Sequence, residues 1–343
     1  MKKKKRIAAL LLAALLLTGC AAKTSPDSQP SSTATSVPDT TKSTGVGFYF
    51  DTVVTVTLYG APEGLMDEIW AACAQYENLL SKTIATSDVS RINTADGQTV
   101  TVDAETWEIL RRAKEISSLT GGAFSVTIAP LTAMWDFTDG TNRMPTDEER
   151  IAALPLVGDS RIELGENNTV TLPAGMQIDL GGIAKGYIAD KVAELVRGRC
   201  YGAIISLGGN VYTVGDKPDG SLVSVGIQDP EGPTNTYFTV VYTKDKSVVT
   251  SGTYERGFTL DGVRYHHILD PKSGLPSASD LVSATLVMES SMDADALATA
   301  CIVVGSEEAL KLLAAQKVDG LLVTTDGQVL YTEGFPEAYM VSQ

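Results

Sequence analysis

The 343-residue sequence has few of the side chains from which several common kinds of site are built. Its only two histidines, His266 and His267, are adjacent. Neighbouring side chains on a strand point to opposite faces, so these two cannot bind one zinc ion together. The four cysteines include no closely spaced pair, which argues against a zinc site and a disulfide framework. Three of them are expected to be buried thiols, namely Cys73, Cys200 and Cys301.

Three familiar motifs are also missing. No Gly-Lys dipeptide occurs, so there is no Walker A loop, and neither a GxSxG elbow nor a GxGxxG turn after a strand is present. Basic residues are outnumbered, 27 against 42 acidic ones, for a net charge of −15. Nucleic acid and anionic membrane surfaces are therefore not expected as partners.

The N-terminus is the one strongly basic segment. Residues 2–6 are Lys or Arg, residues 7–17 are apolar, and Cys20 follows where the apolar run ends. Such a run is too short to remain in a bilayer as a helix, and residues 17–20 fit a bacterial lipobox. We expect residues 1–19 to be a signal peptide and Cys20 to carry lipid on the extracytoplasmic face of the cell membrane. The alternative is a plain secreted protein.

The mature chain divides by composition into a tether and a folded part. Residues 20–46 are rich in Ser, Thr, Pro and Asp, and are expected to form a flexible tether. Residues 47–343 are expected to form one large unit or two closely packed halves. Strand patterns such as 48–59 alternate with helical patterns such as 65–80, without regular βαβ spacing. The fold class predicted is α+β, with mixed or antiparallel sheets and packed helices.

The segment 177–190, QIDLGGIAKGYIAD, joins an apolar strand to an amphipathic helix. Asp179 ends the strand, the pair Gly181 and Gly182 lets backbone approach a ligand, and Lys185 supplies a cation. These features favour a phosphate site. An ordinary strand-to-helix turn with a surface lysine is the alternative.

A second candidate site lies in DADALATA, residues 293–300. Asp295 and Thr299 are four residues apart and share a helix face, whereas Asp293 lies about 200° away and should point elsewhere. A carboxylate and a hydroxyl suit a hard cation such as Mg²⁺. The alternative is an acidic first turn that favours the helix dipole. One of the two histidines could act as a general acid or base.

Several motifs together resemble the ApbE family of flavin transferases, from about Phe48 to the C-terminus. They are residues 119–137 (LTGGAFSVTIAPLTAMWDF), 177–190, 207–210 (LGGN), 248–258 (VVTSGTYERGF), 266–276 (HHILDPKSGLP) and 293–300.

The resemblance implies a T-fold-like core and transfer of FMN from FAD to a Thr or Ser hydroxyl, with release of AMP. The acceptor would be an extracytoplasmic protein or a domain of a membrane redox complex. Mg²⁺ would be held by Asp295, Thr299 and the carbonyl of Gly182. The HILDP match favours His267 as the catalytic histidine. Lys185 would stand beside the phosphates.

Cofactor-binding residues are also implied. Asp179 would bind polar atoms of the FAD, and flavin or adenine would contact Phe50, Ala123, Phe124, Ser125 and Ile268. Ser125 departs from the family pattern, which usually has aspartate there, so any role of that carboxylate is lost or weakened. An FAD pyrophosphatase and a non-catalytic flavin- or solute-binding lipoprotein are the alternative functions.

Overall fold

The computed structural model describes residues 40–135, 137, 142–233 and 236–340. The predicted signal peptide, Cys20 and most of the predicted tether lie outside these residues. The fold is α+β, as the sequence predicts. No helix among the described residues has the length and hydropathy needed to cross a membrane.

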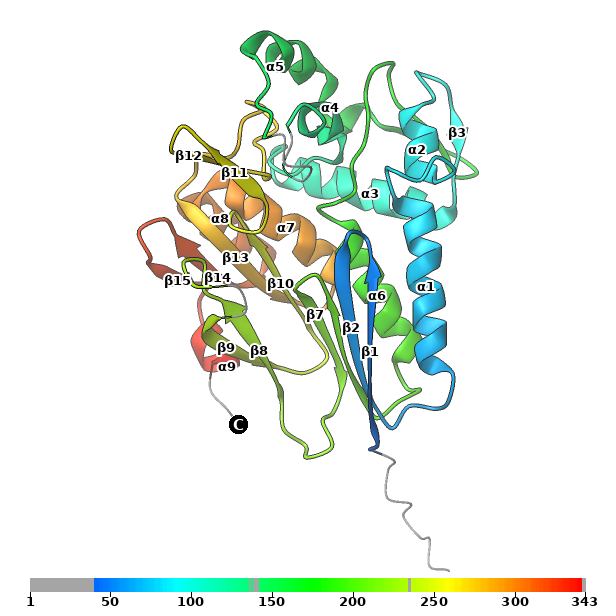
Figure 1. Cartoon of the computed structure of the whole chain (residues 1–343), viewed down its shortest axis with the longest axis vertical. Coiled ribbons are helices and arrows are strands. Elements are labelled where there is room, and N and C mark those ends of the chain that lie inside the picture. Colours follow the sequence, from blue (N-terminus) through cyan, green and yellow to red (C-terminus); the bar gives the residue numbers. More distant parts are fainter. Residues whose placement is uncertain (1–39, 136, 138–141, 234–235, 341–343) are drawn as a thin grey trace, which may run out of the picture. The chain divides into compact units, whose positions relative to one another are not determined.

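One eight-stranded antiparallel sheet is the centre of the fold (Figure 1). Each strand is hydrogen-bonded to the next in the order β1-β2-β6-β7-β10-β13-β14-β15. Their bounds are β1 Lys42–Tyr49, β2 Thr52–Tyr59, β6 Gly202–Leu207, β7 Asn210–Gly215, β10 Ser247–Gly252, β13 Leu281–Met288, β14 Asp319–Thr324 and β15 Val329–Tyr331.

Helices cover one face of this sheet, as expected for the class. The helix α7 (Ser291–Val304) contacts β10 and β13, and α6 (Ala184–Val196) contacts α7, β6 and β7. The helix α1 (Leu65–Leu80) contacts α6 and β1. Apolar side chains from these helices and the strands form the main core, because each helix turns its apolar stripe toward the sheet. The helix α8 (Ser306–Gln316) adds to this layer beside β14.

A smaller apolar cluster lies beside the strands of the C-terminal half. It includes residues of the hairpin of β8 (Val223–Gln228) and β9 (Tyr237–Thr243), together with Phe335 of α9 (Phe335–Tyr339). Val248 and Val287 contribute to it from the sheet. The strands β10 and β13 therefore bury side chains on both faces.

The remaining elements gather toward the top of Figure 1. The helices are α2 (Asp88–Asn93), α3 (Ala104–Leu119), α4 (Ala129–Thr132) and α5 (Asp147–Ala153), with short 3₁₀ turns at Val126–Ile128, Leu154–Leu156 and Asp159–Arg161. The strands are β3 (Val100–Thr101), β4 (Glu163–Gly165) and β5 (Thr169–Thr171) in one small sheet, and β11 (Gly257–Leu260) and β12 (Val263–His266) in a hairpin.

The N-terminal strand prediction was partly wrong. Residues 48–59 form not one strand but the end of β1, a turn at Phe50 and Asp51, and β2. The strand β1 begins at Lys42, inside the predicted tether. Residues 42–45 are polar or glycine and lack strand alternation, and they become a strand because β2 offers them hydrogen-bond partners.

Candidate active site

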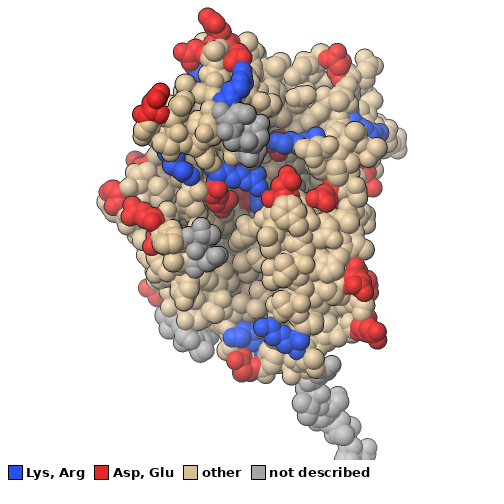
Figure 2. Space-filling view, viewed as in Figure 1, with Lys and Arg blue, Asp and Glu red and all other residues tan. Residues whose placement is uncertain are grey.

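A cavity of about 720 Å³ opens between the main sheet with its helices and the elements at the top of Figure 1. Figure 2 shows it as a hollow where basic and acidic side chains gather. Its walls come from the β1–β2 turn, the loop before α6, the end of β10, the helix α7, and residues 123–135, 137 and 267–271. These segments are far apart in the sequence and meet only in the fold.

The strand predicted to end at Asp179 is wrong: the residues before α6 form a loop, and two of its N–H groups hold it in place. The N–H of Asp179 donates to the carbonyl of Val126 at 2.7 Å, and the N–H of Gly181 donates to Asp179 Oδ1 at 2.8 Å. Gly182 packs closely, since a Cβ there would lie 3.3 Å from the Phe124 ring and 3.6 Å from Thr299 Oγ1. The loop is therefore a fixed wall of the cavity.

The helices α6 and α7 touch at Gly186. A Cβ at this position would lie 2.2 Å from the carbonyl oxygen of Ser291, so only glycine fits. The N–H of Gly186 donates to Asp295 Oδ2 at 3.0 Å. This contact brings the start of α6 beside Asp295 of α7. The two sequence motifs, residues 177–190 and 293–300, therefore form one site.

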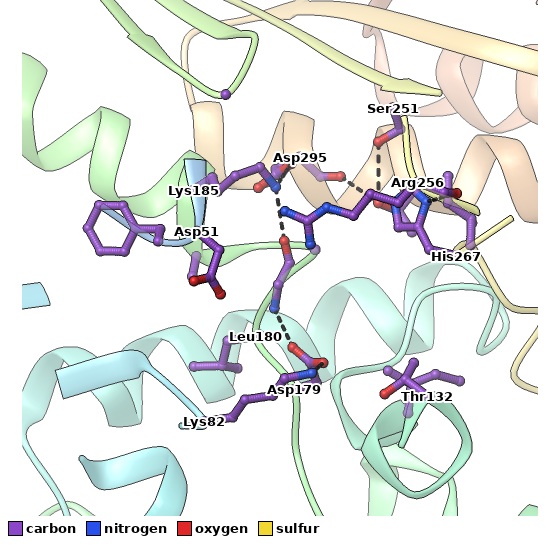
Figure 3. A pocket seen from close by; sticks show the side chains of 18 of the residues that line it. Asp51, Lys82, Thr132, Asp179, Leu180, Lys185, Ser251, Arg256, His267 and Asp295 are labelled. Carbon is purple, nitrogen blue, oxygen red and sulfur yellow. Dashed lines mark hydrogen bonds and ion pairs between the residues drawn. The ribbon is translucent and has the colours of Figure 1, made fainter. Parts of the chain in front are cut away.

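Asp295, Thr299, Lys185 and Gly182 lie together, as the resemblance implies. Asp295 is 3% exposed, and its Oδ1 lies 3.5 Å from Lys185 Nζ, which also donates to the carbonyl of Gly181 at 3.0 Å. Thr299 donates through Oγ1 to the carbonyl of Asp295 at 3.1 Å. Figure 3 shows Lys185 and Asp295 side by side at the cavity.

Asp293 points elsewhere, as its helix position predicts. Its carboxylate pairs with Arg112 of α3, with distances of 2.8 and 2.7 Å to Nε and Nη2. Asp295 is therefore the carboxylate that α7 contributes to the cavity.

The donor set fits a hard divalent cation only in combination with a substrate. The described residues contain no group of three His, Cys, Asp or Glu side chains that could hold a metal by themselves. Asp295 and Thr299 offer oxygen atoms beside the backbone of Gly182. Oxygen donors in this number suit Mg²⁺, which keeps waters and phosphate oxygens among its ligands.

Asp179 lines the cavity but is already paired. Its Oδ2 lies 2.6 Å from Nζ of Lys82, and both side chains appear at the lower side of Figure 3. Lys82 lies in the loop between α1 and α2, outside the motifs that the sequence analysis singled out. Binding of cofactor atoms by Asp179 stays a prediction.

Arg256 is a second residue that sequence reasoning passed over, although it lies in the TSGTYER motif. Figure 3 shows its guanidinium extending into the cavity on the side of Lys185. None of the described residues accepts a hydrogen bond from this guanidinium. An unpaired arginine at a cavity is suited to bind a phosphate with two parallel hydrogen bonds.

The two histidines point to different surroundings, as predicted. His266 Nε2 lies 3.0 Å from the carbonyl of Ser277, whereas His267 lines the cavity and its Nδ1 lies 3.2 Å from the carbonyl of Arg256. That contact makes Nδ1 the protonated nitrogen and leaves Nε2 as an acceptor. Burial lowers the pKa of His267 to about 4, against a smaller opposing effect of the hydrogen bond to Arg256.

The predicted contacts of flavin or adenine all line the cavity, at Phe50, Ala123, Phe124, Ser125 and Ile268. Sequence reasoning missed two further aromatic residues of the lining, Trp135 and Phe137, which stack with ring centroids 5.6 Å apart. The apolar rings lie in the same cavity as the charged groups. A planar ring system with an anionic tail would match this distribution.

Ser125 stands where the resemblance leads us to expect aspartate, but its side chain contacts the carboxylate of Asp159. Its Oγ donates to Asp159 Oδ1 at 2.5 Å, and Asp159 is only 2% exposed. The backbone N–H groups of Val126 and Thr127 also donate to Asp159, at 2.9 and 3.0 Å. Asp159 therefore holds this wall in place from behind, and no local sequence pattern indicates this contact.

The sequence model of the ApbE family matches residues 50–322. The chain belongs to the ApbE family. Curated relatives of this ApbE protein include an FAD:protein FMN transferase of Treponema pallidum (strain Nichols), 36% identical over 295 residues, which cover 80% of this chain and 81% of that protein. An FAD:protein FMN transferase of Klebsiella pneumoniae (strain 342) is 34% identical over 282 residues, 81% of this chain and 87% of that protein.

Solved ApbE structures share the fold. The ApbE protein of Thermotoga maritima has a TM-score of 0.81 and 31% identity, covering 87% of this chain and 99% of that one. The flavin transferase ApbE of Vibrio cholerae has a TM-score of 0.79 and 27% identity, with the same coverage. The family assignment made from the motifs is confirmed.

Proposed function

We propose that this ApbE protein is an FAD:protein FMN transferase, which moves FMN from FAD to a Thr or Ser hydroxyl of an acceptor protein and releases AMP. The observation that carries the proposal is the meeting of Asp295, Thr299 and Lys185 at the loop before α6, inside a cavity that also holds Arg256 and His267. The names of the relatives support the same activity.

The cations of the cavity would bind the pyrophosphate of FAD. Lys185 is fixed by Gly181 and Asp295, while the guanidinium of Arg256 has no hydrogen-bond partner in the part of the chain that the structure describes. Charge-assisted hydrogen bonds from both would stabilise negative charge on the phosphate oxygens. The chain as a whole carries a net charge of −15, and the fold brings the cations Lys185 and Arg256 together at the cavity.

Mg²⁺, held by Asp295, Thr299 and the Gly182 carbonyl, would supply further neutralisation of the phosphate charge. The acceptor oxygen bonds to the phosphorus of FMN, and the bond from that phosphorus to the AMP oxygen breaks. Nε2 of His267 would take the proton of the acceptor hydroxyl, because its Nδ1 proton is held by the Arg256 carbonyl. AMP leaves with the electron pair of the broken bond.

Phosphorus NMR of FAD incubated with protein and Mg²⁺, with and without an acceptor, tests the proposal. Transfer predicts slow or absent hydrolysis of FAD alone, and rapid AMP release with covalent flavin when acceptor is added. Rapid conversion of FAD to free FMN and AMP that acceptors do not change would establish a pyrophosphatase. FAD binding without any turnover would establish a binding protein.

Anchoring at the cell membrane is also proposed, with the acceptor in a membrane redox complex. Support comes from the lipobox-like residues 17–20 and from the polar segment that follows. A tether attached to lipid would bring the enzyme close to membrane-held acceptors. Cys20→Ser should release the protein from the membrane fraction, and unchanged fractionation would contradict the anchor.

A further inference from the structure

The β1–β2 hairpin presents an apolar face beside the cavity. Val46 and Phe48 are each 68% exposed, and Val53 is 54% exposed. Phe48 stands opposite Val53, so the three side chains lie on one face of the hairpin, which we call the hairpin face. Residues 43–50 and 52–59 contain no charged side chain, and Figure 2 shows uncharged surface below the hollow, where Figure 1 places the hairpin. Such a surface is unusual in a chain with 69 acidic and basic residues, 42 and 27.

The strand β1 also has a free edge. It is the first strand of the eight-stranded sheet, so no described strand pairs with its outer side. The turn of two residues makes Tyr49 and Thr52 a hydrogen-bonded pair, and alternation then directs the backbone groups of Phe48, Val46 and Thr44 away from β2. The same residues that expose apolar side chains therefore offer unpaired N–H and C=O groups.

This edge leads to the active site. Phe50, Asp51 and Thr52 close the hairpin and also line the cavity. The turn is pinned to α1, because the N–H of Phe50 donates to Glu77 Oε1 at 2.8 Å. The strand β1 begins at Lys42 and ends at Tyr49, so the end of its edge that lies next to the cavity is the C-terminal end of the strand.

We propose that the edge of β1 and the hairpin face bind an extended, largely uncharged segment of the acceptor protein as an added strand, which directs its hydroxyl to the cavity. This rests on the proposed transfer, which requires a protein chain to reach the cavity. Backbone hydrogen bonds would give affinity, and the apolar side chains would fix the register. Residues 43–50 of the edge carry no charged side chain, although the chain as a whole is acidic.

The test compares Val46→Pro, Val46→Thr and Phe48→Gln with the wild-type protein. Proline removes an outward N–H without a bond to β2, a change that edge strands tolerate, whereas threonine keeps it. The probe is a soluble domain whose threonine a related transferase modifies, and covalent flavin is measured by gel fluorescence against acceptor concentration. We expect KM for the acceptor to rise about tenfold or more in Val46→Pro and Phe48→Gln and less in Val46→Thr, with KM for FAD unchanged.

The matched control is Ile151→Gln on α5, a residue 58% exposed that does not line the cavity. It should leave both KM values unchanged. If all variants transfer flavin like the wild type while the wild type is active, the docking proposal alone is wrong. If the wild type hydrolyses FAD and labels no acceptor, the transfer itself is wrong and the docking proposal falls with it. If Val46→Pro converts a wild-type dimer to a monomer without changing transfer, the edge binds a second copy instead.

Discussion

On the wall formed by α6, α7 and the loop between Asp179 and Lys185, the polar side chains are held by partners from the protein. Asp295 is buried against Lys185 and Gly186, and Thr299 is bonded to α7 itself. On the wall formed by residues 255–268, Arg256 extends into the cavity, and no described residue accepts a hydrogen bond from its guanidinium or contacts Nε2 of His267 by one. The first wall is preorganised for a cation and phosphates, and the second carries groups that still await a partner.

The largest effect is expected on the fixed wall. Asp295→Ala should abolish Mg²⁺-dependent turnover with a modest loss of stability, because the site loses its carboxylate for the metal. Turnover is measured at saturating FAD and Mg²⁺. Asp293→Ala, which breaks the pair with Arg112 on the far side of the same helix, is the control. Full activity of Asp295→Ala would remove the metal assignment.

The second prediction concerns the two histidines. His267→Ala should lower the rate about 10²-fold or more, the usual share of a general acid or base, while His266→Ala acts mildly. Because burial lowers the pKa of His267 to about 4, its basic form persists at neutral pH, and the wild-type rate should fall only as the pH approaches 4. Equal effects of both substitutions, or a fall centred near the ordinary pKa of 6.5, would contradict this role.

Substitution of Arg256 should change KM for FAD more than it changes the rate of the chemical step. Arg256→Ala should raise KM for FAD about tenfold, because the pyrophosphate loses a charge-assisted contact, and Arg256→Lys should recover part of it. Arg199→Ala serves as control, since Arg199 pairs with Glu68 at 2.6 Å, outside the cavity lining. An unchanged KM for FAD in Arg256→Ala would show that the guanidinium does not meet the substrate.

The smallest effect is expected from a change at Asp190, which joins the two helices of the fixed wall. Asp190 of α6 accepts hydrogen bonds from the N–H groups of Ser291 and Met292 at 2.7 and 3.0 Å, and so ties α6 to the start of α7. Asp190→Asn should raise the Mg²⁺ concentration for half-maximal activity several-fold and leave the maximal rate nearly unchanged. A lower maximal rate at saturating Mg²⁺ would point to a different role.

The same residue gives a test by pH. Burial raises the pKa of Asp190 to about 6, from its ordinary value of 3.8, despite the opposing hydrogen bonds. The folded state therefore binds the proton more tightly than the unfolded state, and this residue lowers stability as the pH rises from about 4 to about 6. Thermal unfolding of wild type and Asp190→Asn across this range should differ in slope, and parallel curves would contradict the shift.

The sequence predicted the fixed wall better than the other wall, for a physical reason. Asp295 and Thr299 lie on one helix, so spacing alone places them on a common face, and Asp179 and Lys185 lie in one short motif that spans a loop and the start of α6. Lys82 and Arg256 reach the cavity from loops, whose course depends on the packing of distant segments.

Some features of the fold depend on pairing that no local pattern reveals. Asp159 supports Ser125 across 34 residues of sequence, a contact without any local signal. The start of β1 was missed because residues 42–46 have no strand pattern of their own and take their conformation from β2. The lipid anchor at Cys20 stays a prediction.

The turn at Phe50 and Asp51 has a cost that bears on how this enzyme would respond to engineering. Both residues adopt left-handed backbone angles, φ +58° and +55°, which asparagine and glycine accept far more readily than phenylalanine does. A search for heat-resistant variants would therefore favour Asn-Gly at these positions. Replacing Phe50 would also remove its aromatic ring from the lining of the cavity. Heat resistance should therefore rise, and the turnover rate should fall, when this one turn is changed.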